Sequence, residues 1–188
     1  MPTIEQMRDR AKAWELLTKY TKSESLLKHA LAVEAAMRHF AEKFGEDIDY
    51  WGAVGLLHDF DYEAYPDTHP QAGVDIIKEN GYDDQFSQTL LSHVDTTGVP
   101  RDSQVRKTLF AVDELCGFVT AVALVRPSKK IADVKVKSVK KKMKDKAFAR
   151  QVSREDITNG AADLGLPLEE VIENVIAAMT KASDDLGL

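Results

Sequence analysis

The chain has 188 residues, of which 44% are hydrophobic and 30% charged, and its formal net charge is −6. This size and composition are typical of a globular protein, and we expect one domain over residues 1–188. The single cysteine, Cys116, excludes an intrachain disulfide and fits a reducing compartment, so we expect a cytoplasmic protein. Residues 1–10 lack the apolar core of a signal peptide, and the longest apolar run, residues 110–125, is interrupted by Asp113 and Glu114. We therefore expect no membrane association.

Positive charge is concentrated in one segment. Residues 126–150 carry a local charge of +9, so the rest of the chain carries −15. An acidic body with one basic segment argues against general nucleic-acid binding. Such a lysine run is usually a solvated surface. The functional alternative is a patch that holds an anionic substrate, for which the candidates are Arg126, Lys137, Lys140 and Lys141.

Hydrophobic periodicity predicts helices and no useful strands. The expected helices cover residues 3–20, 26–44, 49–59, 71–80, 84–93, 103–125, 136–143, 153–164 and 167–179. Proline and glycine predict loops over residues 61–70 and 96–100. The sequence Ser153-Arg154-Glu155-Asp156 is a capping-box pattern. We expect an all-α fold with a helical core over residues 1–127 and a helical extension, containing the basic segment, over residues 128–188.

An apolar run ends abruptly in polar residues at positions 58–63. A helix that buries Leu56 and Leu57 carries His58 and Asp59 toward the interior, where an unpaired imidazole or carboxylate is costly. A metal ion satisfies a neutral imidazole and a carboxylate together.

Two further polar residues, His29 and Asp113, also lie on otherwise apolar helix faces. Each of these residues taken alone is more often a hydrogen-bonded core residue than a ligand. Two histidines and two aspartates together form a mixed nitrogen and oxygen set, which suits Mn, Fe, Co, Ni or Zn more than Ca. The occurrence of all four residues in one chain is what favours a metal site.

The order His29…His58-Asp59…Asp113 resembles the H…HD…D signature of the HD-domain superfamily of metal-dependent phosphohydrolases. The resemblance covers roughly residues 22–127. It implies a helical bundle, here with additional C-terminal helices, in which these four residues bind a divalent metal ion.

His69 and His93 extend the resemblance. Binuclear members of the superfamily place two histidines between the HD pair and the last aspartate, and Asp59 would then bridge two ions. The segment 68–73 is similar to the His-x-x-x-Gly element of those proteins. The alternative is that both histidines bind substrate phosphate or act as acid/base groups, so the resemblance implies one or two ions.

The chain also departs from the family pattern. Asp61 and Tyr62 stand where the HDIG variant has glycine and often lysine, so this loop has no lysine that could reach a phosphate. Val94 follows His93, which removes a His-His pair, and we do not expect a cyclic-di-nucleotide phosphodiesterase of the HD-GYP type. Asp61 and Glu63 lie where a general base or a partner of a metal ligand could sit; the alternative is that they are solvated loop acids.

These observations lead us to expect a phosphohydrolase that acts on a nucleotide or another small phosphate ester. A metal-activated water would attack, Asp59 would be central to the site, and Asp61 or Glu63 would orient or deprotonate the water. Two alternatives stay open: a metal-stabilised binding or regulatory module without turnover, and a di-iron oxygenase. The sequence does not determine the substrate, the native metal or the oligomeric state.

Overall fold

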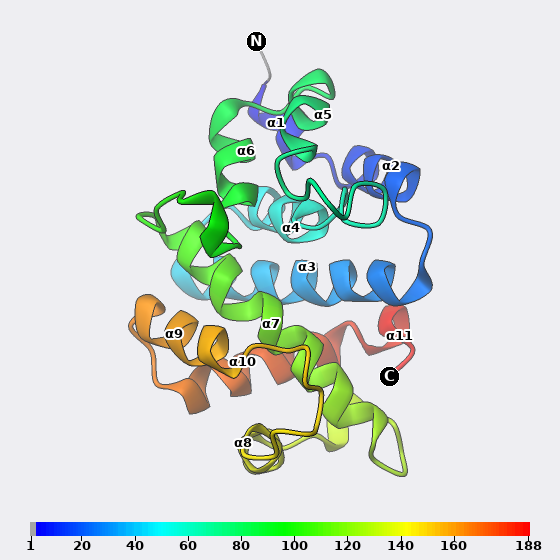
Figure 1. Ribbon diagram of the computed structural model, residues 1–188, viewed down its shortest axis with the longest axis vertical. Helices are drawn as coiled ribbons and strands as arrows, with labels where there is room; N and C mark the ends of the chain where they lie inside the picture. Colours follow the sequence, from blue (N-terminus) through cyan, green and yellow to red (C-terminus); the bar gives the residue numbers. More distant parts are fainter. Residues whose placement is uncertain (1–2) are drawn as a thin grey trace.

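The two longest periodic segments of the sequence form the two central helices. The computed structural model describes residues 3–188, so the first two residues of the expected domain lie outside the described part. Helix α3 (Glu24–Phe44) and helix α7 (Gln104–Leu124) pack against each other in the middle of the molecule (Figure 1). Helix α3 ends at Gly45, whose left-handed backbone (φ 72°) lets its N–H bond to the last carbonyls of the helix.

The other elements surround these two helices. They are α1 (Ile4–Arg8), α2 (Arg10–Tyr20), α4 (Ile48–Leu57), α5 (Gly73–Glu79), α6 (Asp84–Leu91), η1 (Asp95–Thr97), η2 (Ile131–Asp133), α8 (Val136–Met143), α9 (Arg154–Leu164), α10 (Leu168–Lys181) and α11 (Ser183–Leu186). Residues 3–188 contain no β-strand, which confirms the all-α prediction. Within the same range, no helix combines the length and the apolar character needed to cross a bilayer.

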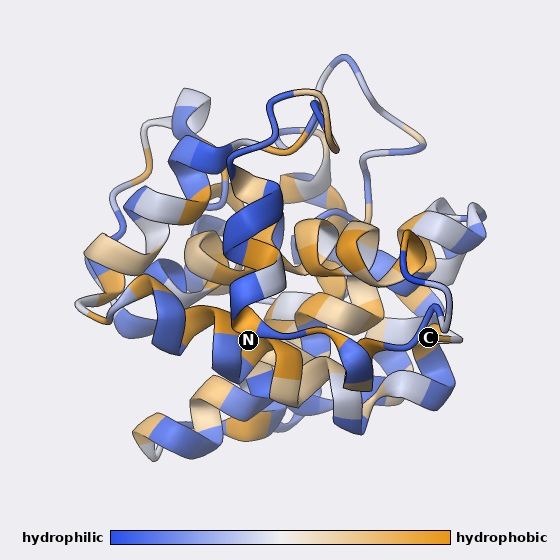
Figure 2. Cartoon of the chain, turned by 90° about the horizontal axis from the view of Figure 1, so that it is seen from below, coloured by the Kyte–Doolittle hydropathy of each residue, from blue (hydrophilic) through white to orange (hydrophobic). Residues whose placement is uncertain are grey.

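Helix α3 lies between two groups of helices. Helix α4 packs along one side of α3, while α7 and α10 pack on the other (Figure 1). Helix α9 packs on α7, and α8 lies at the end of the molecule away from α4 and α6. Hydrophobic residues gather where the helices face one another, and hydrophilic residues dominate the outer turns and loops (Figure 2). The largest fully buried side chains include Phe40, Phe60, Phe86 and Phe118, one from each of several different segments.

Some predicted boundaries were wrong. Residues 3–20 form two helices because Asp9 adopts an extended backbone, and its carboxylate accepts the N–H groups of Ala11 and Lys12 at 3.0 and 3.2 Å. The same residue therefore ends α1 and caps α2. Helix α5 begins at Gly73, not at residue 71, and the short helix α11 was not predicted. At Ser153 the hydroxyl accepts the N–H of Asp156, as the capping pattern predicts.

Two glycines allow helices to approach at backbone distance. A Cβ atom on Gly55 of α4 would lie 2.9 Å from Glu34 Cα and from Val33 O of α3. A Cβ atom on Gly160 of α9 would lie 2.5 Å from Ala111 Cα of α7. Since backbone atoms cannot move aside as flexible side chains do, these two positions set how closely α4 and α9 lie to the central pair.

We expect Gly160→Ala to lower the free energy of unfolding by about 1–3 kcal/mol, because the added methyl group forces α9 away from α7. Gly117→Ala is the matched control. A Cβ at Gly117 meets no atom within 4 Å, so this change should stabilise α7 by about 0.5–1 kcal/mol. Urea denaturation of both variants measures the difference. Equal stability of the two variants would contradict the close contact between α7 and α9.

Candidate metal centre

Three helices bring the four signature residues together. His29 comes from the first half of α3, His58 and Asp59 follow the last residue of α4, and Asp113 lies in the middle of α7. One donor atom from each of the four lies within 4.8 Å of all the others. Asp113 Oδ1 is 3.0 Å from His29 Nε2 and 3.3 Å from His58 Nε2. We call these four residues the first cluster.

A second cluster shares Asp59 with the first. It contains Asp59, His69 and His93, whose donor atoms also lie within 4.8 Å of one another. Asp59 Oδ1 is 3.2 Å from His69 Nε2 and 3.0 Å from His93 Nε2. The other oxygen, Asp59 Oδ2, is 3.4 Å from His58 Nε2 of the first cluster. The two carboxylate oxygens of Asp59 thus face different clusters.

In two of the histidines, the ring nitrogen that points away from the clusters donates a hydrogen bond to a backbone carbonyl. His58 Nδ1 lies 2.7 Å from the carbonyl of Gly55, and His93 Nδ1 lies 2.6 Å from the carbonyl of Leu90. Each of these histidines follows a helix end and reaches the carbonyl three residues earlier. Because a carbonyl only accepts, each Nδ1 must carry the proton. In the neutral imidazoles, Nε2 then presents its lone pair to the clusters, as in histidines that bind metals.

The inward-facing atoms fit a bound cation. His58 Nε2 is buried and has no hydrogen-bond partner, and its nearest neighbours are carboxylate oxygens of Asp59 and Asp113. His69 Nε2 and His93 Nε2 lie 3.3 Å apart. Lone pairs that face carboxylates and each other repel unless a positive charge lies between them. The donor set, nitrogen and carboxylate oxygen, is that of divalent transition-metal sites.

The pKa shifts of the cluster residues also show that positive charge is stabilised at this site. Burial alone would lower the pKa of His69, but hydrogen bonds to Asp59 and Asp61 outweigh burial and raise it to about 9. Burial opposes ionisation of Asp113, yet His58 and His29 hold the pKa of this carboxyl well below its usual range. The carboxylates therefore stay ionised at neutral pH and attract cations.

The comparisons with known proteins agree with this geometry. Residues 26–116 match the family model described as HD domain. This part of the chain, which is just under half of it, is similar to HD domains. All four residues of the first cluster lie inside the matched range, as do His69 and His93.

One curated relative is a tRNA (cytidine(56)-2'-O)-methyltransferase of Thermoplasma volcanium. It is 30% identical over 105 residues, which cover 50% of this chain and 31% of the relative. The chain thus spans about a third of the length of this curated relative. No solved structure matches the chain.

Within the matched range, Asp61 lies behind His69 and not beside the open part of the site. Its side chain is 1% exposed, and its Oδ1 atom accepts the Nδ1 proton of His69 at 2.7 Å. A Cβ atom at Gly73 would lie 2.9 Å from Phe60 and 3.1 Å from Asp61, so the start of α5 can approach this carboxylate only as glycine. Asp61 therefore orients His69. Of the two roles expected from sequence, this position fits the partner of a metal ligand and not the base that acts on the water.

Glu63 also differs from its predicted catalytic place. Its Oε2 atom accepts the backbone N–H groups of Lys22 and Ser23, at 2.8 and 3.0 Å, just before α3 begins. These hydrogen bonds lower the pKa of Glu63. The carboxylate is exposed and holds the start of α3, so its position corrects the prediction that it is a general base.

The basic residues predicted to hold phosphate lie elsewhere. Neither Arg126, at the end of α7, nor any residue of α8 lines the cavity around the clusters. Helix α8 carries Lys137, Lys140 and Lys141 and packs on α7 and α10, and Lys140 pairs with Glu169 of α10. The structure thus corrects the prediction that these side chains overhang the site.

Two polar residues that line the cavity, Glu114 and Tyr62, were not predicted as site residues from the sequence. Glu114 lines it beside Asp113 and accepts the N–H of Ser153 at 3.1 Å. Burial, reinforced by Asp113, raises the pKa of Glu114. Tyr62 lines the same cavity, with its ring 5.4 Å from the His69 ring in an edge-on arrangement. For Glu114, the only signal in the sequence was its position next to Asp113. Adjacency in a helix does not predict a shared cavity, because consecutive residues point in different directions.

We expect Asp61→Ala to weaken metal binding at the second cluster by about 10–100-fold, because His69 loses the group that orients it. Asp61→Asn, which keeps an acceptor oxygen, should lose less. Asp67→Ala, on the exposed part of the same loop, is the control and should bind metal as the wild type does. Titration of the apoprotein with Mn²⁺ or Co²⁺ measures the affinities. Unchanged affinity in Asp61→Ala would contradict the positioning role.

Proposed function

We propose that this protein is a metal-dependent hydrolase of small phosphate esters. The observation that carries the proposal is the arrangement of three Nε2 atoms around the two oxygens of Asp59, with the Nδ1 atoms bonded outside the clusters. The similarity of residues 26–116 to HD domains supports metal-dependent hydrolysis. The specific choice of a phosphate ester is our inference from the chemistry of such a site.

The two clusters would hold one ion each. The first ion would be held by His29, His58, Asp59 and Asp113, and the second by Asp59, His69 and His93. The donor set favours Mn, Fe, Co, Ni or Zn. When bound, such ions supply a water of lowered pKa and offset negative charge on phosphoryl oxygens.

The charge of the site makes cations a requirement for binding an anionic substrate. Asp59, Asp61, Asp113 and Glu114 lie at or directly behind the cavity, and no lysine or arginine among residues 3–188 lines it. A phosphate group would be repelled by this field unless bound cations reverse it. The chain itself thus supplies orientation and the negative field that collects the cations, and it supplies no direct cationic contact to the phosphate.

We assign proton transfer to Glu114. It is the cavity carboxyl group that belongs to neither cluster, and its bond to the Ser153 N–H fixes its position. A half-buried carboxyl group whose pKa is raised by burial is suited to exchange protons with a water or a leaving group.

The substrate we propose is a nucleotide or another small phosphorylated metabolite. The similarity to part of a tRNA (cytidine(56)-2'-O)-methyltransferase supports placing nucleotides first among the compounds to test. The acidic body of the chain argues against long nucleic acids as substrates, because only residues 126–150 are strongly basic and none of them lines the cavity.

The same relative also supports a second candidate function. About half of this chain resembles less than a third of a longer enzyme, as a module would. In that case the ions stabilise a binding or regulatory module without turnover. A di-iron oxygenase would use the same six residues with iron and oxygen.

One set of measurements separates these functions. Metal content per chain is determined first, and nucleotides and simple phosphate mono- and diesters are then assayed with Mn²⁺, Fe²⁺, Co²⁺, Ni²⁺ and Zn²⁺. Turnover of a phosphate ester that depends on the ion supports the hydrolase. Bound ions with no turnover of any ester support the module, and oxygen consumption with iron supports the oxygenase.

We expect Asp59→Asn to lose metal at both clusters and to reduce turnover about 100-fold or more, because one carboxylate serves both. Asp49→Asn is the control, since Asp49 is exposed and pairs with Arg38 outside the clusters. Elemental analysis and the ester assay measure the two effects. Two ions per chain and full turnover in Asp59→Asn would refute the assignment.

Glu114→Gln should reduce turnover about 100-fold while metal content stays unchanged, because the amide cannot transfer the proton. Glu63→Gln makes the same chemical change at the start of α3 and should keep turnover close to wild type, with at most a lower melting temperature. The reverse pattern, with Glu63→Gln inactive and Glu114→Gln active, would restore the prediction made from sequence and exclude Glu114.

A further inference from the structure

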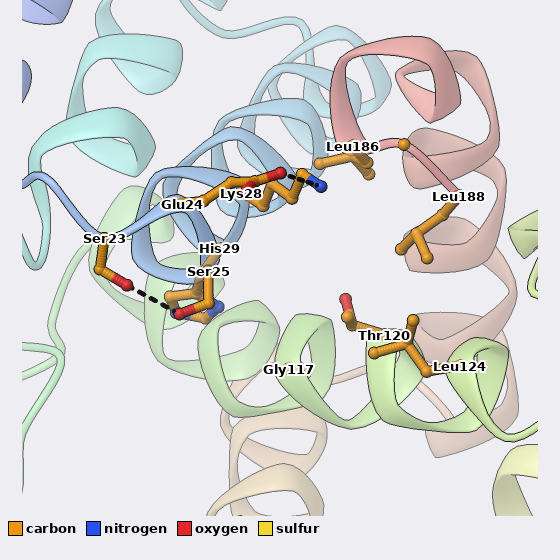
Figure 3. A pocket seen from close by; sticks show the side chains of 11 residues that line it. Ser23, Glu24, Ser25, Lys28, His29, Gly117, Thr120, Leu124, Leu186 and Leu188 are labelled. Atoms are coloured by element: carbon orange, nitrogen blue, oxygen red, sulfur yellow. Dashed lines mark hydrogen bonds and ion pairs between the residues drawn. The ribbon is translucent and has the colours of Figure 1, made fainter.

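A larger cavity adjoins the metal centre. It has a volume of about 630 Å³ and lies between the start of α3, the second half of α7 and residues 186–188 (Figure 3). The cavity that contains the clusters has about 320 Å³, and both cavities are lined by His29 and Gly117. The two spaces therefore meet at these residues.

One face of α7 leads from the metal centre into the larger cavity. Asp113, Gly117, Thr120 and Leu124 follow at intervals of four, three and four residues, which places them on one side of the helix. Gly117 has no side chain, and a Cβ atom there would meet nothing within 4 Å. Glycine at this position keeps the passage between the two cavities open.

The larger cavity is apolar at the end away from His29. Leu124, which is 49% exposed, faces Leu186 and Leu188 across the open space (Figure 3). Lys28 also lines the cavity beside residues 186–187, where its Nζ lies 3.2 Å from the position of a Cβ atom at Gly187, and it pairs with Glu24 at 2.7 Å. The cavity thus offers mainly apolar surface, together with hydroxyl groups and one lysine that is paired with a glutamate.

We propose that this cavity binds the organic part of the substrate, and that it selects phosphate esters of alcohols that carry an apolar ring or branched chain. The inference rests on the proposed function, since the phosphate would lie at the clusters. The volume lies in the range of small-molecule pockets, and apolar surface buried there contributes to binding in proportion to its area. Small polar esters leave the cavity filled with water and bind weakly.

The test uses two phosphonates that are not hydrolysed, 1-naphthylphosphonate and methylphosphonate, and the Mn²⁺-loaded full chain. Calorimetry should show the naphthyl compound binding at least about tenfold more tightly to wild type. Thr120→Phe fills the cavity from α7 and should abolish this difference, with metal content and methylphosphonate affinity unchanged. Thr158→Phe, on the exposed face of α9, is the matched control and should behave as wild type.

A second variant keeps the proposal testable if Thr120→Phe does not fold. Leu124→Ser removes apolar surface at a half-exposed position and should weaken naphthylphosphonate binding alone. Equal affinity of wild type for both phosphonates, or unchanged naphthyl affinity in both variants, would overturn the cavity proposal.

Hydrolysis assays separate this proposal from the proposed function. Selective naphthylphosphonate binding without hydrolysis of any ester would leave the cavity assignment standing and overturn the hydrolase. Equal kcat/KM values for methyl phosphate and 1-naphthyl phosphate would support the hydrolase and overturn the selectivity. Failure to bind either phosphonate would overturn both.

Discussion

The site depends on hydrogen bonds that fix the Nδ1 atoms of three histidines on the side away from the clusters. In His58 and His93, the Nδ1 proton is committed to a backbone carbonyl three residues earlier, and in His69 the partner is the carboxylate of Asp61. These bonds determine which nitrogen faces inward and leave little rotational freedom to the rings. A cation then finds its ligands already oriented, so binding requires little ordering of side chains.

The closeness of the helices makes this arrangement possible. Gly55 brings α4 to backbone distance from α3, and its carbonyl is the acceptor for His58. The same residue therefore sets the distance between two ligand-bearing helices and the orientation of one ligand. Gly73 has a comparable effect at the second cluster, where it gives α5 room to begin against Asp61. Changes at these glycines would act on the metal centre through position and not through chemistry.

Charge is separated along the molecule. The acidic groups converge on the clusters, whereas α8, which carries part of the basic segment, lies at the end away from α4 (Figure 1). Several of its cations have local partners: Lys140 pairs with Glu169, and Lys142 lies 4.6 Å from the Phe148 ring. These contacts attach α8 to α10 and to the loop that follows α8, which is a structural explanation for part of the lysine run.

The sequence by itself determined the helical class and the identity of the residues that converge. Apolar periodicity predicts helices longer than ten residues. Polar residues such as His29 and Asp113 within apolar stripes indicate a site, because burying an unpaired polar group costs free energy. Tertiary structure alone decided which oxygen of Asp59 faces which cluster, that Asp61 and Glu63 serve as supports, and that Glu114 lines the cavity. It also decided that the lysines of α8 do not line the cavity of the clusters and that a second cavity is lined by Gly117. Each of these depends on how helices distant in sequence cross, and local periodicity contains no information about crossing geometry.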